Sequence, residues 1–264
     1  MSTAHAMSRG LTAEWIKLRS LRSTYVSMAS ALAVALVVGV IDTASVAQHW
    51  ATLSPSERAS FDPVGTSFDG LQFGVLAFGI LGVLASSSEY GTGLIQASLT
   101  AVPRRSVFFA AKAIVVGATS LVLGELFAFG TYFVGQVMLS RSDLDVSLTD
   151  PDVLRAVGGA GLFLAAVALV GLGLGALIRH TAGAVAVLVG LLFVAYGLGR
   201  ALESWSYLPD RLLLANASLV IGQVHVHGDH VRRIPSLGLA YLDLGLYLAV
   251  FLGLGAWRTR RDAQ

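Results

Sequence analysis

The chain has 264 residues, of which 55% are hydrophobic and only 13% are charged, with a formal net charge of +2 and a mean hydropathy of +0.73. Soluble domains carry about 25% charged residues, so this composition excludes a water-soluble globule and predicts a membrane protein. Cysteine is absent, which excludes disulfides, thiolate metal sites and cysteine nucleophiles.

The N-terminal segment precedes any long apolar run and predicts an amphipathic helix. Leu11, Trp15 and Leu18 recur at helical spacing, opposite Glu14 and Lys17. Such a helix lies along a membrane face before the chain turns into its first span. A basic topology anchor and a cleaved signal peptide are the alternative interpretations.

Six apolar runs follow, each long enough to cross a hydrocarbon core of about 30 Å, which takes roughly 20 helical residues. They predict an all-α integral membrane protein with one transmembrane domain over the whole chain. The expected segments are a cytoplasmic amphipathic stretch at 1–23, spans at 24–41, 71–88, 113–139, 154–178, 182–202 and 236–257, and an outer re-entrant loop at 203–235.

The basic residues give the orientation, because Lys and Arg near the spans tend to stay in the cytoplasm. With both chain ends inside, 11 of the 18 Lys and Arg residues lie on the cytoplasmic side. Four aspartates crowd the outer loop after the third span. We therefore expect six transmembrane helices with the N- and C-termini in the cytoplasm.

The segment between the second and third spans, residues 89–112, resembles a docking element in composition. It begins with an acid at the membrane boundary, continues with two glycines and a short apolar-polar helix around residues 94–99, and then meets Pro103 and a basic pair. A helix that projects from the membrane in this way suits a soluble partner. A solvated loop whose arginines set the topology is the alternative.

Three runs in the chain resemble the ABC-2 type permease subunits of bacterial ABC exporters, in particular those of high-GC Gram-positive bacteria. They are LTAEWIKLRSLRSTY at 11–25, SSEYGTGLIQASLTAVPRR at 87–105 and GALIRHTAGAVAVLVGLLF at 175–193. The most specific part is the Glu, Gly-Thr-Gly, Pro-Arg-Arg pattern of the second run. With six spans in matching positions, the resemblance covers nearly the whole chain.

The resemblance implies a division of labour in the bacterial plasma membrane. A homodimer, or a heterodimer with a second permease, holds the substrate path, while a separate cytoplasmic ATPase binds ATP and Mg. A coupling helix after the second span would sit in a groove of the ATPase, and the N-terminal helix would brace the same interface. The implied coupling residues are Glu89, Tyr90, Gly91, Thr92, Gly93, Pro103, Arg104 and Arg105, and the implied interface-helix residues are Trp15, Lys17 and Arg19.

The sequence carries no ATP site of the P-loop type, which needs a Gly-Lys-Ser/Thr unit to hold phosphates. The only lysines are Lys17 and Lys112, and neither follows a glycine. HExxH and GxSxG motifs are also absent from the sequence. We therefore expect a transporter subunit that is not itself an enzyme, binds no cofactor of its own and has no nucleic-acid partner.

Two acids fall inside expected spans, where an ionisable group is expensive and marks a functional candidate. Glu125 lies about twelve residues, or roughly 18 Å, into the third span. It lines the substrate path, meets a second protomer, or is a protonated glutamate bonded to a neighbouring helix. Asp243 in the sixth span is expected to form a structural ion pair with Arg200 or Arg155 near the outer face.

The outer loop also holds His225, His227 and His230, which could bind a divalent metal if the loop folds suitably, although imidazoles in an exposed loop are usually solvated. No metal site is therefore predicted. The favoured function is the permease of an ATP-driven exporter of amphiphilic or drug-like molecules. A proton-coupled secondary transporter that uses Glu125 and a non-transporting scaffold or sensor are the rivals.

Overall fold

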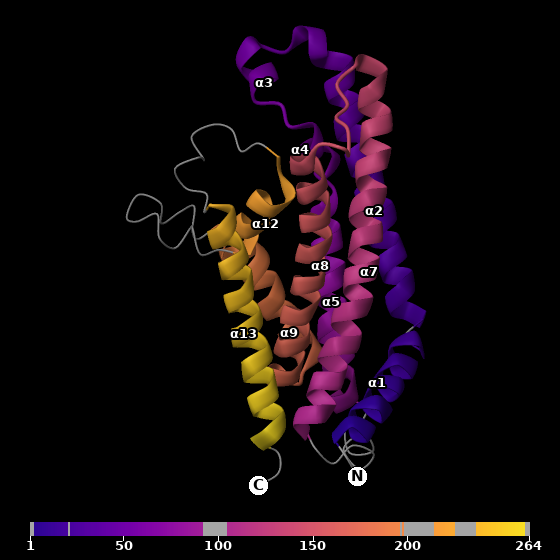
Figure 1. Ribbon diagram of the computed structural model, residues 1–264, viewed down its shortest axis with the longest axis vertical. Coiled ribbons are helices and arrows are strands. Elements are labelled where there is room, and N and C mark those ends of the chain that lie inside the picture. Colours follow the sequence, from indigo (N-terminus) through magenta and orange to yellow (C-terminus); the bar gives the residue numbers. More distant parts are fainter. Residues whose placement is uncertain are drawn as a thin grey trace, which may run out of the picture.

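The computed structural model describes residues 3–20, 22–91, 105–195, 197, 214–224 and 236–261. These residues form an elongated bundle of helices, and strands are absent from them. The start of the first helix and the end of the last lie at the same end of the bundle, at the bottom of Figure 1. We call this end the base and the opposite end the far end.

The elements follow one another along the chain in a simple order. They are α1 (Thr3–Ser20), α2 (Arg22–His49), the 3-10 turn η1 (Trp50–Thr52), α3 (Pro55–Ala59), α4 (Pro63–Ser67), α5 (Leu71–Gly91), α7 (Arg105–Leu139), the 3-10 turn η2 (Ser140–Ser142), α8 (Pro151–Ile178), α9 (Thr181–Val189), the π-helical turn η3 (Gly190–Val194), α12 (Leu214–Gly222) and α13 (Leu237–Arg261).

Helix α8 forms the centre of the bundle, with α5, α7 and α13 against it. Its closest neighbour is α5, and small residues allow the close approach: a Cβ atom on Gly82 would lie 1.8 Å from the carbonyl oxygen of Ala168, and one on Gly171 would lie 2.2 Å from that of Gly79. In a membrane, where lipid is as apolar as leucine, close contact of this kind holds helices together.

Five helices are long and apolar enough to cross a membrane, which confirms the all-α membrane class. The described part of the fifth expected span, 182–202, is the shorter apolar helix Thr181–Val194, and most of its remainder lies outside the described residues. Within the expected loop 203–235, α12 packs against α8 and α13. The five long helices are Tyr25–Thr52, Leu71–Gly91, Arg105–Ser142, Pro151–Ile178 and Leu237–Arg261.

Two helices extend beyond the expected spans. The first long helix continues to His49, past the expected end of its span at residue 41, and the third begins at Arg105, before the expected start at residue 113. The last eight residues of the expected coupling segment are therefore the first two turns of α7. In these two turns Val107 and Phe108 are buried against Ala6 and Met7 of α1. This packing stabilises the helix before the expected start of the span.

Candidate functional site

Helix α1 packs along the beginning of α7 at the base of the bundle (Figure 1). The face that it buries includes Leu18 of the expected apolar stripe and also Glu14. Glu14 and Leu18 are 5% and 4% exposed, whereas Trp15 is 45% exposed. Glu14, which helical spacing places on the polar side of this helix, is buried because its carboxylate finds positively charged partners inside the bundle.

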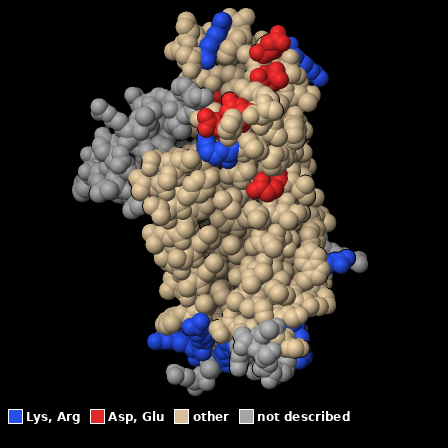
Figure 2. Space-filling model, viewed as in Figure 1, with Lys and Arg blue, Asp and Glu red and all other residues tan. Residues whose placement is uncertain are grey.

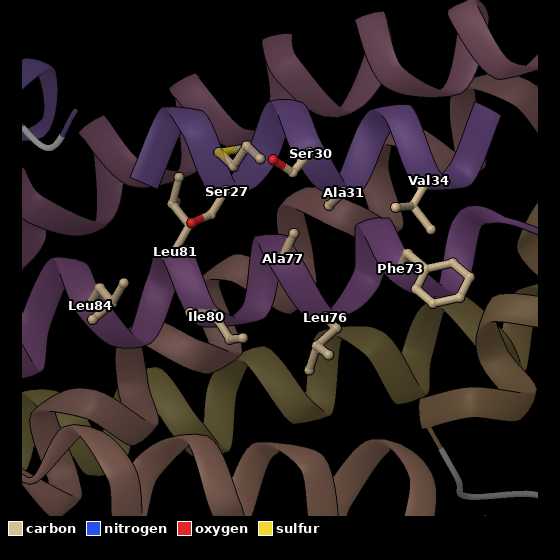
Figure 3. A pocket seen from close by; sticks show the side chains of 11 residues that line it. Ser27, Ser30, Ala31, Val34, Phe73, Leu76, Ala77, Ile80, Leu81 and Leu84 are labelled. Carbon is tan, nitrogen blue, oxygen red and sulfur yellow. The ribbon is translucent and has the colours of Figure 1, made fainter. Parts of the chain in front are cut away.

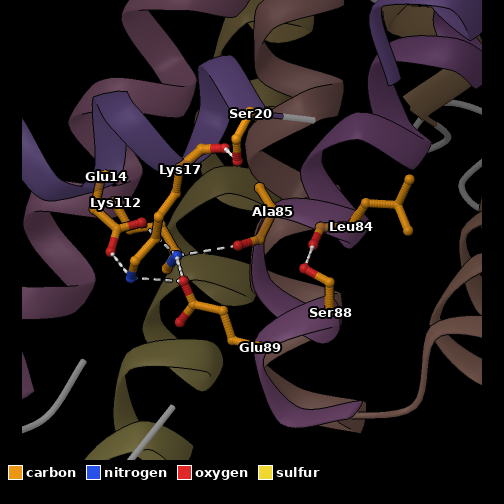
Figure 4. A network of polar contacts seen from close by, with 8 residues as sticks. All are labelled: Glu14, Lys17, Ser20, Leu84, Ala85, Ser88, Glu89 and Lys112. Carbon is orange, nitrogen blue, oxygen red and sulfur yellow. Dashed lines mark hydrogen bonds and ion pairs between the residues drawn. The ribbon is translucent and has the colours of Figure 1, made fainter. Parts of the chain in front are cut away.

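Those partners are two lysines, which form a closed charge network with two glutamates (Figure 4). Lys112 Nζ lies 2.5 Å from Glu14 Oε2 and 2.7 Å from Glu89 Oε1. Lys17 Nζ lies 2.7 Å from Glu14 Oε1 and 2.9 Å from Glu89 Oε1. Two positive and two negative side chains thus alternate around a ring that is neutral overall.

The network is buried except on one side. Lys112, Glu14 and Glu89 are 3%, 5% and 5% exposed, and the side chain of Lys17 is 35% exposed. Removing a lone charge from water costs several kcal/mol, so a buried network of this kind is tolerated only when each charge is compensated. Here each lysine contacts both glutamates, so attraction between opposite charges within the ring offsets the cost of removing them from water.

Further contacts complete the environment of the ammonium groups. Lys112 Nζ also donates a hydrogen bond to the carbonyl oxygen of Ala85, at 3.1 Å. The ring of Phe108 lies 5.2 Å from Lys112 Nζ and 5.4 Å from Lys17 Nζ, within the range of cation-π attraction. All three donors of Lys112 are therefore used, while Glu89 Oε2 is buried and has no hydrogen-bond partner in the part of the chain that the structure describes.

The charge of Lys17 is secured by its neighbours. Burial by itself lowers the pKa of Lys17, but hydrogen bonds and electrostatic attraction from Glu14 and Glu89 outweigh burial and raise that pKa above its ordinary value of 10.5. Lys17 therefore stays protonated at neutral pH.

The network connects three helices that are distant in sequence. Glu14 and Lys17 come from α1, Glu89 from the last turn of α5, and Lys112 from the early part of α7. Glu89 and Arg105 flank the expected coupling helix, of which residues 92–104 lie outside the described part. The ring thus joins the N-terminal helix to the two spans that enter and leave this segment.

The other expected coupling residues are only partly described. The guanidinium carbon of Arg179 lies 4.9 Å from the centre of the Tyr90 ring, and Gly91 is exposed. Arg105 donates a 3.3 Å hydrogen bond to the carbonyl oxygen of Thr259, which ties the start of α7 to α13. Thr92, Gly93, Pro103 and Arg104 lie outside the described residues.

Trp15 and Arg19 of the expected interface helix are exposed on α1, beside Ile16, which is 62% exposed. Lys17, whose side chain is 35% exposed, belongs to the network. Sequence reasoning missed Glu14 and Lys112 as site residues. A usable signal was present in the sequence, since the chain has only two lysines, and Lys112 interrupts an otherwise apolar stretch.

The candidate residues outside the base that the structure describes, Glu125, Arg155 and Asp243, form no ion pair with one another. Glu125 lies at the contact of α7 with α8, beside Gly161. Arg155 lies 3.8 Å from Asp152 and donates a hydrogen bond to the carbonyl oxygen of Gln223, and no ion pair links it to Asp243 in the described part of the chain. Arg200, His225, His227 and His230 lie outside the described residues, and the remainder contains no cluster of His, Cys, Asp or Glu that could hold a metal.

An apolar groove of about 330 Å³ lies between α2 and α5, within two of the candidate spans (Figure 3). Its walls include Met28, Ala31, Phe73 and Ile80, and its only polar side chains are Ser27 and Ser30. The groove holds no charged group, so it can accept hydrocarbon but offers no chemistry.

Comparisons of the chain with protein-family models, with curated proteins and with solved structures found no match. Its function therefore has to follow from its own residues and their geometry.

Proposed function

We propose that the chain is the membrane-spanning permease subunit of an ATP-driven exporter of the ABC-2 type, and that the base of the bundle docks a separate ATPase. The observation that carries the proposal is the closed network of Glu14, Lys17, Glu89 and Lys112. Glu89 lies in the last turn of the helix before the expected coupling helix and Lys112 in the helix after it, and the network joins both to the expected interface helix.

An ATPase can drive a permease only if its movement reaches the membrane spans. A coupling element on a loose linker would absorb that movement. Here buried ion pairs join the last turn of α5, the early part of α7 and one side of α1. Breaking a buried pair costs about 3–5 kcal/mol. Displacement of the coupling segment or of α1 is therefore passed to the two spans as one unit.

The distribution of charge supports a cytoplasmic base. In Figure 2, acidic surface is seen only in the upper half of this face, towards the far end, where basic patches occur as well, whereas the charged surface at the base is basic. Positively charged residues next to spans favour the cytoplasmic side. The exposed or half-exposed basic residues at the ends of α8 and α13 are Arg179, Arg258, Arg260 and Arg261.

Capture of the partner tests the proposal. The tagged chain is purified from its native host in mild detergent, and bound proteins are identified by mass spectrometry. We expect a Walker-motif ATPase with the wild type, and less of it with Arg19→Ala, which changes an exposed residue of α1. The matched control is Arg141→Ala, an exposed arginine in η2 at the far end. Absence of any ATPase in several detergents would contradict the proposal.

A proton-coupled transporter remains the second candidate because Glu125 lies inside a span and forms no hydrogen bond or ion pair with any described residue. Such a protein needs no ATPase. Its efflux would stop with an uncoupler and survive depletion of ATP, whereas the exporter would behave in the opposite way. A scaffold or sensor would show no flux in vesicles that contain both subunits.

A further inference from the structure

Glu125 occupies an unusual position in the middle of α7. Its carboxyl group lies flat against Gly161 of α8, such that a Cβ atom on Gly161 would lie 2.6 Å from Cδ, 2.7 Å from Oε2 and 2.8 Å from Oε1 of Glu125. The preceding residue, Gly124, makes a similar approach, since a Cβ there would lie 2.7 Å from the Gly161 carbonyl oxygen. Two glycines therefore create the space that the carboxylate occupies.

Nothing in the described part of the chain compensates this carboxylate. No described residue forms an ion pair or a hydrogen bond with its side chain, which distinguishes it from Glu14 and Glu89 in the network at the base. Its side chain is half-buried and so remains open on one side. An acid at this depth is costly unless a partner with positive charge or a hydrogen-bond donor reaches it.

The surface around Glu125 is made of exposed apolar side chains on both helices. On the same face of α8, Gly158 has no atom within 4 Å of an added Cβ, so there is open space beside this glycine too. The exposed residues one helical turn away are Leu121 and Val122 on α7, before Glu125, at 39% and 60%, and Leu154 on α8, before Gly158, at 49%. In Figure 2, the middle of the face that is shown is mainly uncharged.

We propose that this surface, made by Glu125, Gly158, Gly161 and the exposed leucines beside them, binds a lipophilic organic cation from the lipid phase. The positive centre lies against the carboxylate, and the apolar body lies along Leu121 and Val122, one turn before Glu125 on α7. One carboxylate compensates one positive charge, so the ligand is monovalent.

The chemistry of the surface favours this class over two others. A small inorganic cation keeps its hydration unless several oxygen ligands replace it, and the described residues provide no such cluster. A second copy of the chain that met this surface across a two-fold axis would bring the same apolar side chains and another Glu125, which supply no positive charge. An organic cation is weakly hydrated and already dissolves in the membrane interface.

Binding can be measured without an ATPase, so the inference goes beyond the permease proposal and can fail separately from it. The purified chain is placed in phosphatidylcholine nanodiscs, and binding of tritiated tetraphenylphosphonium is compared with its partitioning into empty nanodiscs. We expect saturable binding to the wild type. Glu125→Gln, which keeps the shape and removes the charge, is expected to weaken binding by roughly tenfold or more. Asp243→Asn removes another acid from a candidate span and serves as the matched control, with binding unchanged.

A second measurement covers the case in which Glu125→Gln does not fold. Dicyclohexylcarbodiimide modifies carboxyl groups that face lipid, and peptide mass spectrometry of the wild type locates the modification. Tetraphenylphosphonium is expected to protect Glu125 from the reagent. The proposal is overturned by a lack of saturable binding, by equal binding to Glu125→Gln, or by modification without protection. A wild-type dimer that becomes a monomer in Glu125→Gln and binds no tetraphenylphosphonium would assign the surface to a second copy instead.

Discussion

Lys112 Nζ lies 2.5 Å from Oε2 of Glu14, although the two residues are 98 positions apart in the sequence. Lys112 lies in α7 and Glu14 in α1, and both side chains are buried. Either charge alone would be costly to bury, so each depends on the other. Their contact explains how a chain with few charged residues keeps four of them together at the base. It also makes the position of α1 depend on the membrane spans.

Removal of Lys112 should therefore destabilise the protein strongly. Lys112→Met leaves the buried carboxylates of Glu14 and Glu89 without their main partner, and loss of one member of a buried pair costs about 3–5 kcal/mol. We expect a clear fall in the unfolding temperature in detergent. The paired variant Glu14→Gln with Lys112→Met should recover part of the loss, because coupled residues are not additive. Strictly additive effects would mean that the two side chains do not interact.

The raised pKa of Lys17 predicts how the network responds to alkali. A lysine whose pKa rises on folding stabilises the protein at every pH below its unfolded-state pKa, and this contribution is lost as the pH rises through the folded-state pKa. The difference in unfolding temperature between wild type and Lys17→Met should thus stay constant up to about pH 10.5, the ordinary lysine pKa, and then shrink. Arg19→Gln, on the exposed side of α1, is the control. A difference that already shrinks near neutral pH would contradict this assignment.

The sequence alone was sufficient to predict the membrane class and most of the long helices, because a run of about 20 apolar residues is typical of a helix that crosses a membrane. It was insufficient for the network at the base. Helical spacing placed Glu14 on the polar side of α1, since a charge is normally solvated. Its burial depends on Lys112 and Glu89, which only the tertiary structure brings near. The early start of α7 was missed for the same reason, because its first turns are held by α1.

The contact between α5 and α8 should tolerate no side chain at Gly82. A Cβ there would lie 1.8 Å from the carbonyl oxygen of Ala168, so Gly82→Ala forces two backbones apart. Overpacking of a tight core costs about 1–3 kcal/mol, and a backbone contact leaves little room for relief. We expect a lower unfolding temperature and a smaller yield of monodisperse protein. Gly245→Ala on α13, where no atom lies within 4 Å of the added Cβ, should change neither.

The proposed orientation can be tested directly because the chain contains no cysteine, so that a single introduced thiol is the only reactive one. Ala59→Cys places a thiol on exposed α3 at the far end, and Arg260→Cys places one on the exposed last turn of α13 at the base. If the base faces the cytoplasm, a membrane-impermeant maleimide added to intact cells labels Ala59→Cys and leaves Arg260→Cys unlabelled until the membrane is opened. Both thiols should react equally in detergent, which controls for local accessibility. Labelling of Arg260→Cys alone in intact cells would invert the topology and place the charge network on the outside, where no ATPase could reach it.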